Sequence, residues 1–316
     1  MDVVNPVQVW NMDEGFLESP AIINRNLFAR KWKDRDPDTI LNQWQQFNFQ
    51  TIDDFYNNVF ALIPEVRLSG VGLELGAGTG ALSSTVCKKF ENVHTIYAVE
   101  VVEEVVRLLQ PKIMFTICGK RATKIKRVVG SFDALELDTA SVDFCVEIDS
   151  LLHHSNDLGA TLKEVARVMK PNGVLMILDR SHNNRLNEEQ RKFMLDVEYS
   201  EEWMEEQGFD SSRPLTPRDN GEHEIRVGEW KEALRESGFS IEKRFELRKV
   251  GFRRLLRGLM RSVPFRWRKR LNLSPSRAMP HDGEMFWMFA CLMGVARAGG
   301  HYRPALRDHT LFVARR

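Results

Sequence analysis

The sequence predicts a doubly wound α/β domain, in which helices cover both faces of a mostly parallel sheet. An apolar run of strand type at residues 71–75 stops at the glycine-rich turn 76–80. A helical pattern follows directly, with apolar residues at intervals of four, Leu82, Val86 and Phe90. Strand, glycine turn and helix in this order form the first unit of such a fold, where a cofactor binds outside the carboxyl ends of the strands.

Further strands and helices alternate along the chain. A helix is expected over 158–169, and Lys170–Gly173 should end it, because proline cannot extend a helix and glycine suits the turn. Before the first strand, Asp36 and Pro37 are typical of a helix start, and a weaker start at Thr51 leads into an aromatic stripe. That stripe fits either core packing or closure over the cofactor. Later strands are expected at residues 95–100, 141–150, 174–178, 240–247 and 310–315.

Glu74, two positions before Gly76, indicates which cofactor binds. Gly76, Gly78 and Ala81 also satisfy the loose dinucleotide fingerprint G-x-G-x-x-G/A. A carboxylate at Glu74 would repel a pyrophosphate, whereas it suits a ligand with positive charge, such as S-adenosylmethionine with its ammonium and sulfonium. The run E-L-G-A-G-T-G at residues 74–80 closely resembles the first motif, E/D-x-G-x-G-x-G, of class I S-adenosylmethionine-dependent methyltransferases.

A second stretch carries the same resemblance. Residues 162–175, L-K-E-V-A-R-V-M-K-P-N-G-V-L, are similar to the family signature L-x-E-x-x-R-x-L-K-P-G-G-x-L. The resemblance implies a Rossmann-like, seven-stranded α/β sheet with a helical N-terminal segment and two insertions. The expected parts are the helical segment at 1–65, the cofactor-binding core at 66–182, a cap insertion at 183–228, and a completion of the core at 229–316 that holds a basic amphipathic insertion at 249–308.

The resemblance also implies a set of cofactor-binding residues. Glu74 and the loop would hold the methionine end. Glu100, at a strand end near the ~20-residue offset expected for such an acid, would accept hydrogen bonds from the ribose hydroxyls. Many relatives have Asp directly after the glycine of the adenine segment; this sequence has Ser131 there, so Ser131, the Phe132 backbone or Asp133 would contact adenine. The full expected set is Glu74, Gly76, Ala77, Gly78, Gly80, Glu100, Val101, Ser131, Phe132, Asp133 and Glu147.

Histidines are the candidates for proton removal. Methyl transfer from a sulfonium is an in-line displacement, so the protein supplies alignment, and a base where the acceptor must lose a proton. His182 follows the strand expected at 174–178, and Glu222-His223-Glu224 ends the cap, so both should rim one mouth. A histidine flanked by two glutamates fits a base, part of a metal site or a surface cluster. No spacing matches a compact metal motif, and no metal is expected. The predicted catalytic residues are His153, His154 and His223.

The composition is that of an ordinary globular protein, with 43% apolar and 28% charged residues. The four cysteines lie far apart, which indicates free thiols in a reducing cytosol. The N-terminus shows no apolar signal-peptide core, and the longest apolar run, 285–296, is shorter than the ~20 residues that a membrane span needs. These features predict a cytoplasmic protein, with peripheral membrane contact as an extension.

The net charge of +1 hides a strongly basic stretch. Residues 243–277 hold thirteen Lys or Arg and one acid, Glu246. Over 250–271, apolar residues interleave with arginines, which on a helix gives an apolar stripe beside an arginine stripe. Such helices lie on anionic membranes, although nucleic acid, an acidic partner or a merely solvated face also fits.

These observations predict an S-adenosylmethionine-dependent methyltransferase with a small or lipid- or nucleotide-linked acceptor. The expected reaction is O-methylation of a sugar, glycolipid or related metabolite, since the basic insertion suits a membrane-borne or phosphorylated acceptor. No N-P-P-Y-type motif follows the strand expected at 141–150, which disfavours nucleic acid and protein substrates. Two alternatives stay open: an RNA methyltransferase that grips phosphates with the basic insertion, and a cofactor-binding module without catalysis.

Overall fold

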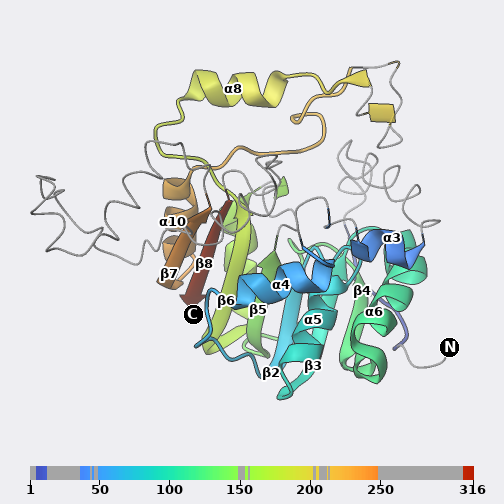
Figure 1. Ribbon diagram of the computed structural model, residues 1–316. Coiled ribbons are helices and arrows are strands. Elements are labelled where there is room, and N and C mark those ends of the chain that lie inside the picture. The colour runs from blue at the N-terminus through green and yellow to red at the C-terminus, as the bar shows by residue number, and fades with distance from the viewer. Residues whose placement is uncertain are drawn as a thin grey trace, which may run out of the picture.

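The computed structural model describes residues 5–12, 36–42, 45, 49–148, 154–155, 157–201, 204–205, 212, 214–247 and 309–316. His153 and the amphipathic stretch 250–271 lie outside the described residues. The described part of the chain is organised around an eight-stranded sheet (Figure 1). Its strands follow the order β1-β4-β3-β2-β5-β6-β8-β7.

Neighbouring strands pair in parallel from β1 to β6, whereas β8 is antiparallel to both β6 and β7. The order of the chain reverses between β2 and β5, so a cofactor is expected at the carboxyl ends of these two strands. The strands are β1 (Gln8–Val9), β2 (Gly70–Leu75), β3 (Val93–Glu100), β4 (Ile125–Val129), β5 (Val142–Ile148), β6 (Met169–Arg180), β7 (Ser240–Leu247) and β8 (His309–Arg315).

Strands β2 to β8 confirm the seven-stranded doubly wound sheet. The short strand β1 is not predicted from the sequence, because residues 1–65 are expected to form a helical segment. It pairs with the edge of β4, Val9 lying opposite Val129. Trp10 follows and packs on Gly130, where an added Cβ would lie 3.1 Å from the Trp10 ring. A strand of two residues is too short to show a period in the sequence.

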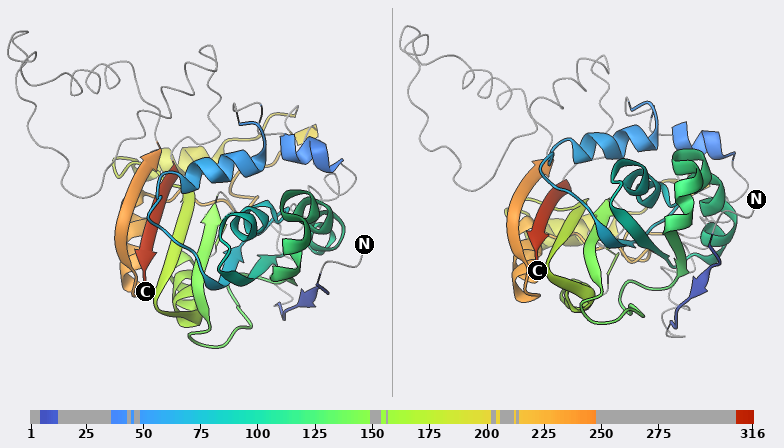
Figure 2. Two further views of the ribbon diagram at one scale, coloured as in Figure 1. Left: turned by 60° about the horizontal axis from the view of Figure 1, so that its bottom comes forward. Right: turned by 90° about the horizontal axis from the view of Figure 1, so that it is seen from below.

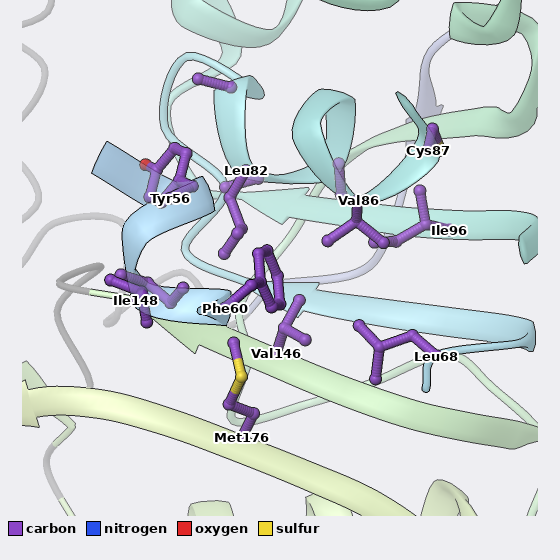
Figure 3. Close-up of a cluster of buried hydrophobic side chains, with 14 of the residues drawn as sticks. Tyr56, Phe60, Leu68, Leu82, Val86, Cys87, Ile96, Val146, Ile148 and Met176 are labelled. Atoms are coloured by element: carbon purple, nitrogen blue, oxygen red, sulfur yellow. The ribbon is translucent and has the colours of Figure 1, made fainter. Parts of the chain in front are cut away.

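Helices cover both faces of the sheet (Figure 2). One face carries α3 (Pro37–Asn42), α4 (Ile52–Phe60), α5 (Ala81–Lys89) and α6 (Gln110–Cys118), and the other carries α7 (Leu158–Val168) and α10 (Val227–Glu236). A π-helical turn (Val105–Leu109) precedes α6, and a 3₁₀ turn (Gly119–Lys124) follows it. Figure 3 shows Phe60 of α4 and Leu82 and Val86 of α5 in the same buried cluster as Val146 of β5.

The two predicted helix starts near the N-terminus are confirmed. Helix α3 begins at Pro37. Thr51 caps α4, because its hydroxyl accepts a hydrogen bond from the Asp54 N–H at 3.2 Å. The aromatic stripe of α4 is core, with Phe55, Tyr56 and Phe60 all buried.

The connection after α7 differs from the predicted turn. The helix ends at Val168, but Lys170–Gly173 forms an irregularity inside β6, where Val142 pairs with Met169 and Phe144 with Val174. The residue with positive φ is Asn172 (64°), and Gly173 is needed for a different reason. A Cβ at Gly173 would lie 2.9 Å from the carbonyl oxygen of Lys170, so this position requires close backbone approach.

The cap insertion leaves the sheet after β6. Its helix α8 (Glu188–Asp196) lies beyond the carboxyl ends of the parallel strands (Figure 1). The returning chain pairs with the outgoing chain, because the His182 N–H donates to the Ile225 carbonyl at 2.7 Å and the Val227 N–H donates to the His182 carbonyl at 2.9 Å. Both ends of the cap are therefore anchored at the edge of the sheet where the cofactor is expected.

Candidate cofactor and acceptor site

The glycine-rich loop joins β2 to α5 at the point where the strand order reverses. Gly78 and Gly80 have φ of 47° and 77°, a region that residues with a Cβ rarely adopt. A Cβ added to Gly78 would meet no atom within 4 Å, whereas one added to Gly80 would lie 2.3 Å from Cε of Met114 in α6. The loop therefore packs on α6 at Gly80 and leaves open space beside Gly78.

Glu100, the last residue of β3, holds this loop. Its Oε2 accepts a hydrogen bond from the Gly78 N–H at 2.8 Å, and its Oε1 accepts one from the Val102 N–H at 3.0 Å. A carboxylate offers about four acceptor positions, so each oxygen retains one for another donor. This geometry leaves room for the two ribose hydroxyls that the sequence predicts at Glu100.

Glu74 lies behind the loop and is 2% exposed. Its Oε2 accepts hydrogen bonds from the backbone N–H of Ser83, at 2.9 Å, and from the Ser83 hydroxyl. Burial raises the pKa of Glu74 to about 8, although the bonds from Ser83 act in the opposite direction. Any attraction of Glu74 for the positively charged methionine end therefore acts from the carboxyl end of β2 and grows as pH rises toward 8.

The predicted adenine segment lies beside Glu100, whose carbonyl accepts a hydrogen bond from the Gly130 N–H at 3.0 Å. The Ser131 hydroxyl accepts from the Asp133 N–H at 3.1 Å, and the Asp133 carboxylate accepts from the Thr161 hydroxyl in α7. A contact of Asp133 with adenine would therefore share the carboxylate with Thr161. The backbone of Phe132 stays the third candidate.

The other predicted cofactor residues surround the loop. Gly76, at the start of the loop, has a φ of 61°. Ala77 is buried and donates its N–H to the Val99 carbonyl at 2.8 Å. Val101 follows Glu100 and packs against the core on the α4–α6 side. Glu147 is fully buried near the carboxyl end of β5.

The predicted histidines differ in their burial and in their contacts. His154 is half-buried, and its Nδ1 lies 3.1 Å from the carbonyl oxygen of Asn220 in the cap. His223 is exposed on the returning segment of the cap. His153 is outside the described residues. The structure thus brings His154 to the cap and leaves His223 at the surface.

Charged and polar side chains join the end of β6 to the cap; we call Arg180, His182, Tyr199, Glu222 and Glu224 the β6–cap cluster. Nη1 of Arg180 lies 2.5 Å from Oε2 of Glu222 and 3.3 Å from Oε1 of Glu224. His182 contacts Glu224 through Nε2, and the Tyr199 hydroxyl donates to Glu222 at 2.6 Å. Burial and the bond to Glu222 raise the pKa of Tyr199 well above its ordinary value, so this phenol stays a donor. His182 and Glu224 are therefore in direct contact, and a mouth rimmed by His182 and residues 222–224 stays a prediction.

Sequence reasoning does not find Ser83, Gln110 or Arg180. Gln110, at the start of α6, donates from Nε2 to the Gly78 carbonyl at 2.9 Å. A helix is expected within residues 102–129, but the sequence carries no signal for a polar side chain that reaches a loop 32 residues earlier. Arg180 follows the strand predicted at 174–178. Its two partners, Glu222 and Glu224, lie close to it only because the cap returns to the sheet.

Two kinds of feature are absent from the residues that the structure describes. Among them, no group of three or more His, Cys, Asp or Glu side chains is placed to hold a metal ion. No helix in the same part of the chain is both long enough and apolar enough to cross a membrane.

Comparison with known sequences finds matches to the central part of the chain. A family model described as a methyltransferase domain matches residues 73–177, from β2 to β6. Polyketide synthase–nonribosomal peptide synthetases of Pyricularia grisea and Aspergillus clavatus are 28% and 24% identical to this chain, each over 53% of its length. The matched segment is 4% of the length of each of these relatives.

Comparison with solved structures supports the fold. The cyclase SpnF aligns with 99% of this chain and 98% of its own, at a TM-score of 0.53 and 14% identity. A protein from Galdieria sulphuraria, provisionally assigned as a sarcosine dimethylglycine methyltransferase, aligns over 84% of both chains at a TM-score of 0.50 and 19% identity. The domain match and the glycine-loop motif show that residues 73–177 form a methyltransferase domain with S-adenosyl-L-methionine as the cofactor, and the solved structures share its Rossmann-like fold.

Proposed function

We propose that this protein is an enzyme that transfers the methyl group of S-adenosylmethionine to an oxygen of a small organic acceptor enclosed between the sheet and the cap. The observation that carries the proposal is the β6–cap cluster. It places two carboxylates and a histidine beside the carboxyl end of β6, the edge of the sheet where the cofactor loop also lies.

Methyl transfer to a hydroxyl needs alignment and a proton acceptor. The sulfonium supplies the reactive methyl group, so the chain's own task is to orient the acceptor and remove its proton. Glu224 is in contact with Nε2 of His182, and a carboxylate that accepts the proton of one ring nitrogen leaves the other nitrogen basic. We propose His182 as the base, with His153, His154 and His223 as the further candidates from the sequence.

The curated relatives favour a second class of acceptor. They are polyketide synthase–nonribosomal peptide synthetases, which suggests a polyketide carbon as the methylated atom. A carbon flanked by carbonyl groups must also lose a proton, so the same cluster would serve. The sugar or glycolipid acceptor expected from the sequence rests on the basic insertion alone, and no comparison supports it.

Incubation with methyl-labelled S-adenosylmethionine tests the proposal. Candidate hydroxyl compounds and β-ketoacyl thioesters would be supplied in parallel, and products and S-adenosylhomocysteine would be measured by mass spectrometry. We expect label on an acceptor oxygen, and no product from a Gly78→Val variant. Label on carbon would favour the polyketide-type acceptor. Cofactor binding without S-adenosylhomocysteine on any acceptor would favour the non-catalytic module.

A further inference from the structure

Gly78 is held from two sides by side chains of different elements. Its N–H donates to Oε2 of Glu100, at the end of β3, over 2.8 Å. Its carbonyl accepts from Nε2 of Gln110, at the start of α6, over 2.9 Å. We infer that Gln110 is a positioning residue for the cofactor: it fixes Gly78, and through the Gly78 N–H it orients the Glu100 carboxylate toward the ribose.

The burial of Gln110 argues against a purely structural role. The side chain is fully buried, and its Oε1 has no hydrogen-bond partner among the described residues. An unpaired buried acceptor destabilises the folded state, so an apolar side chain of the same length would suit the core of α6 better. The contact with Gly78 is the interaction that accounts for an amide in this place.

The effect of Gln110 reaches the ribose through Glu100. Gly78 has no side chain, and an added Cβ there would contact nothing, so no side-chain packing holds this residue. Its position depends on the two hydrogen bonds. When the bond from Gln110 is lost, Gly78 gains conformational freedom and Glu100 loses a fixed donor on Oε2. Glu100 then has to be ordered when the cofactor binds, which lowers affinity.

The inference rests on the cofactor lying over the glycine loop with its ribose at Glu100. Gln110→Met tests it, because methionine keeps the length and removes both polar atoms. Ile113→Leu is the matched control, since Ile113 is equally buried on the same helix and carries no polar group. Calorimetric titration with S-adenosylmethionine should show a Kd about fivefold higher for Gln110→Met, the effect of one neutral hydrogen bond, and an unchanged Kd for Ile113→Leu.

Thermal unfolding and a double variant separate positioning from folding. The Tm of Gln110→Met should equal or exceed that of the wild type. In a Glu100→Ala background, Gln110→Met should change the Kd little, because its effect acts through Glu100. A wild-type Kd in Gln110→Met, a lowered Tm, or the same fold loss in both backgrounds would overturn the inference. A wild type that does not bind S-adenosylmethionine would instead overturn the cofactor assignment on which it rests.

Discussion

The carboxyl group of Glu74 accepts two hydrogen bonds from Ser83, in the first turn of helix α5. This relationship ties the end of β2 to the start of α5 beneath the glycine loop. Because Glu74 is buried, its ionisation is linked to folding and to the charge of the ligand above it.

The Glu74→Gln variant should alter how stability depends on pH. The pKa of Glu74 rises from 4.5 to about 8 on folding, so the unfolded chain loses this proton first as pH increases. The contribution of Glu74 is fully present below pH 4.5, falls as pH rises toward 8, and stays low above that. Glutamine does not titrate. The Tm of the variant relative to wild type should therefore increase from pH 5 to pH 9.

The ionisation of Glu74 should also change the affinity for the cofactor. A positively charged ligand favours the ionised carboxylate, so the affinity of the wild type for S-adenosylmethionine should rise between pH 7 and pH 9. Titrations with Glu74→Gln should lack this rise. Parallel pH profiles for the two proteins would show that Glu74 does not sense the ligand.

Glu100→Ala should weaken S-adenosylmethionine binding by roughly 1.5–3 kcal/mol, because hydrogen bonds to a charged group are lost. Glu103→Ala is the matched control: this exposed glutamate three residues later pairs with Arg107 at the surface. Calorimetry should show an unchanged Kd for the control. Equal Kd values in all three proteins would remove Glu100 from the ribose site.

Loss of the base should lower turnover about 10²–10⁴-fold while cofactor affinity stays intact. Because His182 is buried against Glu224 and His223 is exposed, we expect the largest loss in His182→Ala among the four variants His153→Ala, His154→Ala, His182→Ala and His223→Ala. His94→Ala, an exposed residue of β3, is the control. Turnover near the wild-type value in all four variants would mean that the protein accelerates methyl transfer by aligning the acceptor with the methyl group, without a histidine base.

Arg180→Ala should loosen the cap. It leaves Glu222 and Glu224, both largely buried, without their cation, and we expect a loss of about 2–4 kcal/mol in the free energy of unfolding. Arg218→Ala removes a more exposed ion pair with Asp196 in the same cap and should cost less than about 1 kcal/mol. Denaturant unfolding measures both, and limited proteolysis within 183–221 should be faster in Arg180→Ala alone.

Excision of the basic insertion tests whether the fold and cofactor binding depend on it. Leu247 and His309 lie opposite each other in the β7–β8 ladder, so the chain leaves and re-enters the sheet at one point. An Asn-Gly hairpin in place of residues 248–308 should preserve the fold and S-adenosylmethionine binding. We propose that the stripe at 250–271 binds anionic membranes, with about 1 kcal/mol per basic residue.

Flotation with vesicles checks the membrane proposal. The full chain should float with anionic vesicles and not with neutral ones, and added salt should reverse this. The excised form and a variant with Arg253, Arg254, Arg257 and Arg261 changed to Glu should both stay in solution. A wild type that floats with neither lipid would contradict the proposal.

The fold could be predicted because the glycine loop and the 162–175 signature are local in sequence. What the sequence could not show depends on contacts between distant segments. Ser83 faces Glu74 because α5 starts beneath the loop, and Arg180 meets Glu222 only after the cap returns. The two-residue strand β1 and the positive φ of Asn172 are set by neighbouring strands rather than by a periodic pattern.

The position of β8 has a consequence for synthesis of the protein in the cell. This strand, made after β6 and β7, lies between them, and its residues His309–Ala314 are all buried. While the ribosome translates residues 248–308, β7 has no partner strand and the edge of β6 is open. The sheet is therefore incomplete until β8 is made, so a premature stop codon in that stretch would yield a product with two exposed strand edges, which promote aggregation.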